Sequence, residues 1–171
     1  RLIPLGMTTG IKMFSGGAMI VGFASEETTG SPSAADKGGL EVGDIILKIN
    51  GVCVESNEEL SKALSELDES FAVFTVNRGG QETDVTVQNL IPGENGGYKL
   101  GAWVRDSMAG IGTITYVDPS TGNFGALGHG ICDVDTGLLM PLSKGSTMPS
   151  EVIDVVKGTS GSPGQLVGSF D

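Results

Sequence analysis

The only histidine of the chain, His129, is the side chain best suited to chemistry. It lies in residues 124–133 (FGALGHGICD), where small residues stand on both sides of it. Small neighbours leave an imidazole accessible, as a general base must be in order to reach a nucleophile. A lone histidine is more often an ordinary polar residue at a strand end, so the setting is what makes His129 a candidate general base.

Two serines near the C-terminal end, Ser160 and Ser162, are candidate nucleophiles. Residues 157–164 (KGTSGSPG) superficially resemble the G-x-S-G-x-P motif of chymotrypsin-like peptidases, but Ser160 follows His129 by only 31 residues. Such peptidases place the two residues on different barrels, and a barrel needs on the order of six strands of about five residues. We therefore interpret both serines as loop residues, and a compact hydrolase that uses Ser160 stays a weaker alternative.

No acid that could orient the imidazole is singled out by its spacing. Asp133 and Asp135 alternate with Val134 and would share one face of a strand, but two carboxylates are too few for a metal site. Two distant cysteines, Cys53 and Cys132, form no metal-binding cluster and are expected to stay unpaired. We expect no metal and no cofactor. The five candidate acids are Asp106, Asp118, Asp133, Asp135 and Asp154.

The first ninety residues alternate strand-like and helix-like segments. Apolar runs at 11–14 and 19–23 are separated by a predicted turn at 15–17, and the run 45–49 ends in Asn50-Gly51, a strong hairpin signal. A short helix is predicted to start within residues 30–33, where a proline stands beside serine caps, and to stop at the glycines at 38–39. A second helix, capped by Ser56 or Asn57, carries apolar residues at 60, 63, 64 and 67. Strands at 71–76 and 84–87 precede a linker at 92–97.

Residues 31–51 (SPSAADKGGLEVGDIILKING) resemble the PDZ signature of bacterial proteases. The resemblance implies that a peptide adds as a strand beside the second helix, with its carboxylate held by a glycine-containing loop. The predicted loop is 5–10 and the predicted strand is 11–14. The alternative is that the apolar residues of 11–14 are ordinary strand residues. The predicted peptide-binding residues are Gly10, Ile11, Met13, Leu60 and Leu64.

The second half carries fewer charges and more turns. Strands are predicted at 100–104, 111–117 and 124–127, with a turn at 118–123, where every residue is a turn former. Together with 28 glycines, this favours a mostly β fold with short helices: an α+β PDZ domain at 1–92, followed by a partial trypsin-like β-barrel at 97–171.

Two further stretches, 105–113 (RDSMAGIGT) and 125–136 (GALGHGICDVDT), are more specific than the PDZ pattern. With the PDZ signature before them, they resemble the stage IV sporulation protein B (SpoIVB) peptidase family. The resemblance implies a serine endopeptidase of endospore-forming bacteria that is secreted into the space between the forespore and mother-cell membranes. There it would cleave itself and a membrane-bound regulator, which leads to activation of a sigma factor.

The same resemblance maps the catalytic histidine of the family to His129. It places the catalytic Asp and Ser downstream, and aligns 157–164 with an earlier family segment of the KGT.G.PGE type. We therefore expect the chain to end before the nucleophile and to be inactive by itself. The alternative from another class is a non-catalytic PDZ module that only binds peptide ends.

Charge and hydropathy limit the partners. The net charge of −11, from 10 basic and 21 acidic residues, supplies no basic surface for nucleic acid. The longest apolar stretch, 18–24, is too short to cross a bilayer, which takes roughly 20 residues. The expected partners are a peptide or protein substrate, including a segment of the same parent chain, and the membrane-bound regulatory protein that the resemblance implies.

Overall fold

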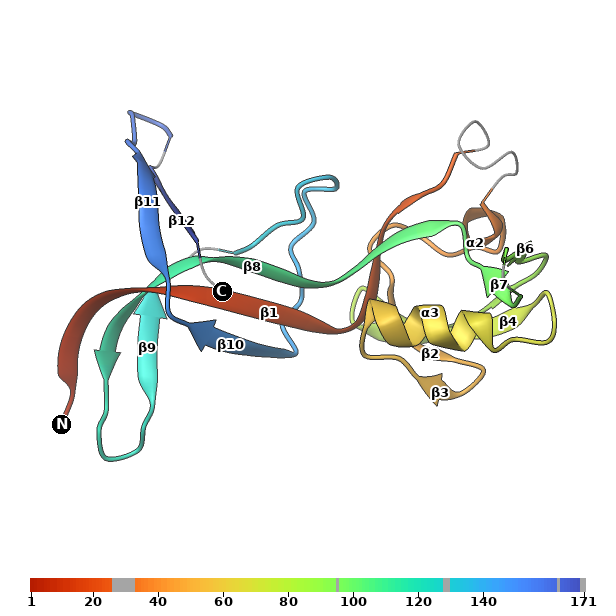
Figure 1. Cartoon of the computed structure of the whole chain (residues 1–171), viewed down its shortest axis with the longest axis horizontal. Helices are drawn as coiled ribbons and strands as arrows, with labels where there is room; N and C mark the ends of the chain where they lie inside the picture. Colours follow the sequence, from red (N-terminus) through yellow and green to blue (C-terminus); the bar gives the residue numbers. More distant parts are fainter. Residues whose placement is uncertain (26–32, 95, 128–129, 163, 170–171) are drawn as a thin grey trace. The chain divides into compact units, whose positions relative to one another are not determined.

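The computed structural model describes residues 1–25, 33–94, 96–127, 130–162 and 164–169. These residues form twelve strands and two short helices (Figure 1), which confirms the predicted mostly β class. The described strands form no closed barrel. The two cysteines are both free and exposed.

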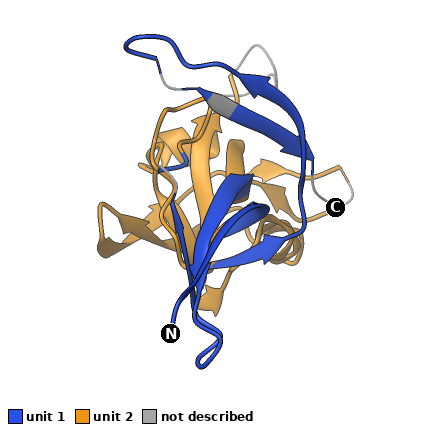
Figure 2. Cartoon of the chain, turned by 90° about the vertical axis from the view of Figure 1, so that its left-hand side faces the viewer, with its two compact units in different colours: residues 1–13, 108–131, 145–171 blue, residues 14–107, 132–144 orange. Residues whose placement is uncertain are grey.

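The chain divides into two compact units that interleave along the sequence (Figure 2). Unit 1 contains residues 1–13, 108–131 and 145–171, and unit 2 contains 14–107 and 132–144. Two long strands, β1 (Ile3–Phe23) and β8 (Ala102–Val117), contribute to both units. The predicted domains, 1–92 and 97–171, were consecutive, whereas the compact units are not, because each long strand has one half in each unit.

Unit 2 holds most of the core. Its sheet has the order β5 (Gln81–Val87), β4 (Ala72–Arg78), β2 (Ile45–Ile49), β1, β8. Outside this path, β3 (Val52–Cys53) pairs with β2, and β6 (Ile91–Pro92) pairs with β7 (Tyr98–Lys99). Several of its apolar side chains are buried against one another: Ile20, Ile46, Val54, Leu60, Phe74, Val76 and Val87.

The predicted Asn-Gly hairpin is present between β2 and β3. Asn50 has a φ of 47° and Gly51 a φ of 80°, the left-handed values that a tight turn between twisted strands requires. The Oδ1 atom of Asn50 also accepts a hydrogen bond of 2.8 Å from the backbone N–H of Val73. The hairpin is therefore fixed both by its own backbone and by strand β4.

Both predicted helices form, and each begins at a serine cap. In α2 (Ala34–Lys37) the cap is Ser33, and in α3 (Asn57–Ser65) it is Ser56. The Ser56 hydroxyl accepts a hydrogen bond from the N–H of Glu59, and the Glu59 carboxylate accepts one from the N–H of Glu55. The first bond satisfies a donor that the first helical turn leaves without a partner, and the second satisfies the N–H of the residue just before the cap. Of the two predicted caps, Ser56 is correct.

The predicted turn at 15–17 is wrong, because β1 runs through it as one strand. Ser15 donates its hydroxyl to the carbonyls of Gly17, at 2.6 Å, and of Asp106 in β8, at 3.0 Å. Gly16 has a φ of 75°, a left-handed backbone conformation that glycine adopts easily. The chain nevertheless continues in the same direction as one strand. Pairing with β8 therefore outweighs the turn preference of Ser-Gly-Gly.

Unit 1 is built from strands, with little enclosed core. Strand β9 (Phe124–Leu127) pairs with β8 across the predicted turn at 118–123, which Asp118 closes by accepting from the N–H and hydroxyl of Ser120. Strand β10 (Lys144–Met148) pairs with β1, and β11 (Glu151–Val156) pairs with β12 (Gln165–Ser169). Every residue of β11 is exposed.

Candidate peptide groove and peptidase motif

A pocket of about 530 Å³ lies in unit 2 between helix α3 and the segment 93–104. Its floor is apolar, because Leu60 and Leu64 of α3 are 3% and 7% exposed and face it. Exposed Ser61 and Ser65 line its rim on the helix side. The opposite wall comes from residues near the start of β8: Tyr98, Lys99, Leu100, Gly101, Ala102, Trp103 and Val104.

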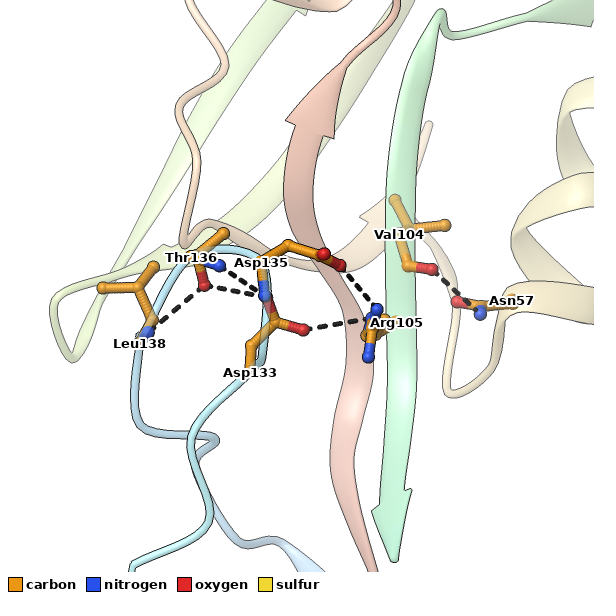
Figure 3. Close-up of polar contacts among 7 residues, drawn as sticks. All are labelled: Asn57, Val104, Arg105, Asp133, Asp135, Thr136 and Leu138. Atoms are coloured by element: carbon orange, nitrogen blue, oxygen red, sulfur yellow. Dashed lines mark hydrogen bonds and ion pairs between the residues drawn. The ribbon is translucent and has the colours of Figure 1, made fainter.

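The first residue of α3 ties the helix to β8. Asn57 donates from its Nδ2 atom to the carbonyl of Val104 at 3.3 Å (Figure 3), and its backbone N–H donates to Oδ2 of Asp106 at 2.9 Å. Of the three residues, Val104 also lines the pocket. The first residue of α3 therefore lies beside residues 104–106 of β8, and the helix also contacts β7.

The predicted groove residues fall into two groups. Leu60 and Leu64 lie together in the pocket, whereas Gly10, Ile11 and Met13 belong to unit 1 and do not line it. The side chain of Ile11 packs directly over Gly112, where a Cβ atom would find no room. Residues 10–13 are part of strand β1 and belong to unit 1, whereas the strand that contributes to the lining of this pocket is β8.

Sequence reasoning missed Trp103, the only tryptophan. Its indole ring lies against Gly22 of β1, where an added Cβ would come within 3.3 Å, and 62% of its surface is exposed. The signal that could have pointed to it is the apolar run 100–104, which predicts a barrel strand. An exposed aromatic ring at a pocket rim is a common feature of binding sites.

The candidate acids have different environments. Asp106 accepts from Asn57, and Asp154 is exposed in β11. Asp118 caps an exposed turn, where the hydrogen bonds from the Ser120 hydroxyl and N–H lower the pKa of its carboxyl group.

Asp133 is the buried acid of the group, with 1% of its surface exposed. Its Oδ1 atom accepts from the N–H groups of Asp135 and Thr136 and from the Thr136 hydroxyl, at 2.9–3.1 Å. Burial alone would raise the pKa of Asp133, but these hydrogen bonds and the charge of Arg105 lower it on balance. The prediction that Asp133 and Asp135 share a strand face is wrong, because the two residues lie in a turn. Both carboxylates form ion pairs with Arg105.

His129 lies outside the described residues. The candidate nucleophiles are described: Ser160 and Ser162 are exposed and lie at the end of the β11–β12 hairpin. Thr159 and Ser162 exchange two backbone hydrogen bonds of 2.9 Å, which fixes a tight turn. Their placement agrees with the loop interpretation of this motif.

Two negative findings concern the described residues alone. No group of three or more histidine, cysteine or acidic side chains among them could hold a metal ion. None of the described helices combines the length and the apolar character that a membrane crossing requires.

The fold and the pocket define a PDZ-containing protein, and the family comparison agrees. Residues 28–78 match the family model of a PDZ domain, and residues 96–171 match the model described as SpoIVB peptidase S55. Residues 96–171 thus match the SpoIVB peptidase family and follow a PDZ match, the order that the motifs predicted. A comparison with curated proteins found no match.

Proposed function

We propose that this chain is the PDZ-bearing part of a serine endopeptidase and that the pocket between α3 and β8 binds an extended peptide segment. The observation that carries the proposal is the pocket itself: Leu60 and Leu64, which belong to the PDZ match, lie opposite the start of a strand. An apolar floor suits an apolar side chain of the peptide, and backbone hydrogen bonds from a strand hold its main chain.

In the peptidase reaction, His129 would act first as general base and then as general acid. It would take the proton of the attacking serine hydroxyl as the serine oxygen bonds to the scissile carbonyl carbon. It would then give that proton to the leaving amine as the C–N bond breaks, and water would hydrolyse the acyl-enzyme. A further part of the parent chain would supply the serine and the orienting acid.

The proposed role is sporulation signalling. The parent protein would act in the space between the forespore and mother-cell membranes, where it would cleave itself and a membrane-bound regulator. The match to the SpoIVB peptidase family supports this role. The occupant of the pocket would then be a segment of a substrate or of a second copy of the parent chain.

Peptide binding can be measured by fluorescence, because Trp103 is the only tryptophan of the chain and lines the wall of the pocket. The test titrates the chain with synthetic decapeptide pools that carry free or amidated C-termini. We expect a saturable change in fluorescence. Ser61→Tyr, which fills the pocket from its rim, should abolish this change, whereas Lys62→Tyr, on the neighbouring exposed position outside the lining, should leave it intact. Equal binding by both variants would refute the placement.

A non-catalytic binding module is the second candidate, and the exposed turn that holds Ser160 and Ser162 favours it for the isolated chain. Reaction of the chain with a fluorophosphonate probe separates the two candidates. Labelling that requires both Ser160 and His129 would show a nucleophile in this chain. Labelling of a serine in a longer parent protein, lost on His129→Ala, would support the endopeptidase.

A further inference from the structure

The pocket between α3 and the segment 93–104 has one cation and one acid among the described residues that line it, Lys99 and Glu94. The Nζ atom of Lys99 lies 2.9 Å from Oε1 of Glu94, so the two side chains form an ion pair. Solvent reaches both of them, since 57% of the Lys99 side chain and 87% of the Glu94 side chain are exposed. The hydrogen bond from Lys99 also lowers the pKa of the Glu94 carboxyl group. The pocket therefore combines an apolar floor with one accessible charged pair.

The backbone that carries Lys99 is held by the PDZ core. In β7, Lys99 pairs with Ile91 of β6, and β7 contacts helix α3. The next residue, Leu100, is 4% exposed, and its carbonyl accepts a hydrogen bond of 3.1 Å from the N–H of Ala35. The point at which the Lys99 side chain leaves the backbone is therefore fixed relative to the leucine floor of the pocket.

Glu94 instead belongs to a short turn between two glycines. The N–H of Gly93 donates to the carbonyl of Gly97 at 3.0 Å and closes this turn. An ion pair between two exposed side chains contributes little to stability, so Glu94 is a replaceable partner for Lys99. A lysine ammonium group has three donors, and a carboxylate that enters with a peptide can share it with Glu94 or take the place of Glu94.

The shape of an extended peptide limits where its acid can stand. Leu60, Leu64 and Lys99 line the same pocket, so two peptide side chains must enter it from one face of the peptide strand. Successive side chains of a strand alternate between its faces, and residues two apart share a face. An apolar side chain on the leucine floor and an acid two residues away meet this requirement, whereas an acid directly beside the apolar residue points away.

A peptide also carries a carboxylate at its C-terminus, which PDZ domains hold with backbone N–H groups of a glycine-containing loop. The loop predicted for that role, residues 5–10, lies in β1 and contributes none of the described lining of this pocket. The carboxylate that suits Lys99 is therefore that of an acidic side chain.

We propose that Lys99 is a specificity-determining residue: the pocket binds an internal peptide segment in which an acidic side chain stands two residues from an apolar one. Leu60 and Leu64 pack against the apolar side chain, Lys99 pairs with the acid, and Glu94 competes with the peptide for Lys99. The inference rests on the proposed function, because it specifies what the same pocket binds.

The test uses acetylated and amidated decapeptides with one leucine, in which glutamate stands either two residues from the leucine, on one side or the other, or directly beside it. Each has a matched glutamine version, which is also made with a free C-terminus, and Trp103 fluorescence reports binding. We expect glutamate two residues away, on one side of the leucine, to strengthen binding about threefold over glutamine, as suits an exposed ion pair. Glutamate directly beside the leucine should bind like its glutamine version.

Three variants separate the charges. Lys99→Gln should remove the preference for glutamate, whereas Glu94→Gln should increase it, because the competing carboxylate is gone. Lys62→Gln is the matched control: it removes one exposed cation from a pair with Glu66 on α3, outside the pocket lining, and should leave the preference intact. Added salt should weaken the preference of the wild-type chain, since it screens exposed charges.

The outcomes distinguish this inference from the proposed function. Saturable but equal binding of the glutamate and glutamine peptides would overturn the inference and leave peptide binding in place. A preference that survives Lys99→Gln would overturn it too, as would a Lys99-dependent gain that follows the free C-terminus rather than the glutamate side chain. If none of the peptides binds, the proposed function fails and the inference fails with it.

Discussion

Asp44 and Arg78 form a bidentate pair at the edge of the PDZ core. The Nε and Nη2 atoms of Arg78 each lie 2.7 Å from one oxygen of the Asp44 carboxylate, which is 1% exposed. The N–H of Glu41 donates to the same carboxylate at 2.8 Å. Asp44 belongs to the Gly-Asp step of the PDZ signature, and Arg78 ends strand β4, so the pair joins two segments that lie 34 residues apart.

We expect Arg78→Ala to lower the free energy of unfolding by about 2–3 kcal/mol. The change leaves the buried Asp44 carboxylate without its cation, and this value allows for the part of Arg78 that remains in solvent. Urea denaturation measures the loss. Lys62→Ala, in an exposed i,i+4 pair, should cost less than about 0.5 kcal/mol. Equal effects of the two changes would contradict the importance of the buried pair.

Asp133 should make stability depend on acid pH. Because its pKa is lowered from the ordinary 3.8 in the folded chain, its ionised form stabilises the fold above that value, and this contribution is lost as the pH falls through the lowered pKa. Asp133→Asn should therefore destabilise the chain at neutral pH. The difference from the wild type should shrink as the pH falls below 3.8. Denaturation curves over a pH series measure it, and a pH-independent difference would show that the charge plays no part.

Ser56→Ala should weaken helix α3 by about 1 kcal/mol, the usual cost of a lost serine cap. The hydroxyl accepts from the Glu59 N–H at 3.2 Å, and alanine offers no acceptor there. Ser61→Ala, an exposed position within the same helix, is the control and should be nearly neutral. Thermal unfolding of the two variants gives the comparison, and a larger loss for Ser61→Ala would argue against the cap.

The 171-residue chain should remain unlabelled by a fluorophosphonate probe. Ser160 and Ser162 lie in an exposed hairpin turn, and a serine hydroxyl is a weak nucleophile unless a base lies within hydrogen-bond reach. Mass spectrometry of the treated chain checks this. A modified Ser160 whose labelling disappears on His129→Ala would replace this interpretation with that of a compact hydrolase.

Local features of this protein could be predicted from the sequence because neighbouring residues decide them. The caps at Ser33 and Ser56, the Asn50-Gly51 hairpin and the turn at 118–123 all depend on the φ preferences or side-chain oxygens of a few adjacent residues. The matches to the PDZ and SpoIVB peptidase models could also be predicted from residue order alone, since the motifs are contiguous stretches. The same kind of reasoning failed at 15–17, where a local turn signal competed with a long-range strand pairing.

The tertiary structure alone decided which distant segments meet. An apolar strand pattern shows that one face is buried but not which strand lies beside it, so the sequence could not distinguish residues 11–14 from β8 as the neighbour of α3. Charged residues are equally ambiguous: nothing local pairs Arg78 with Asp44, or Arg105 with Asp133 rather than with another acid among 21. Those partners are chosen when the chain packs, because a buried carboxylate is stable only where folding brings a cation to it.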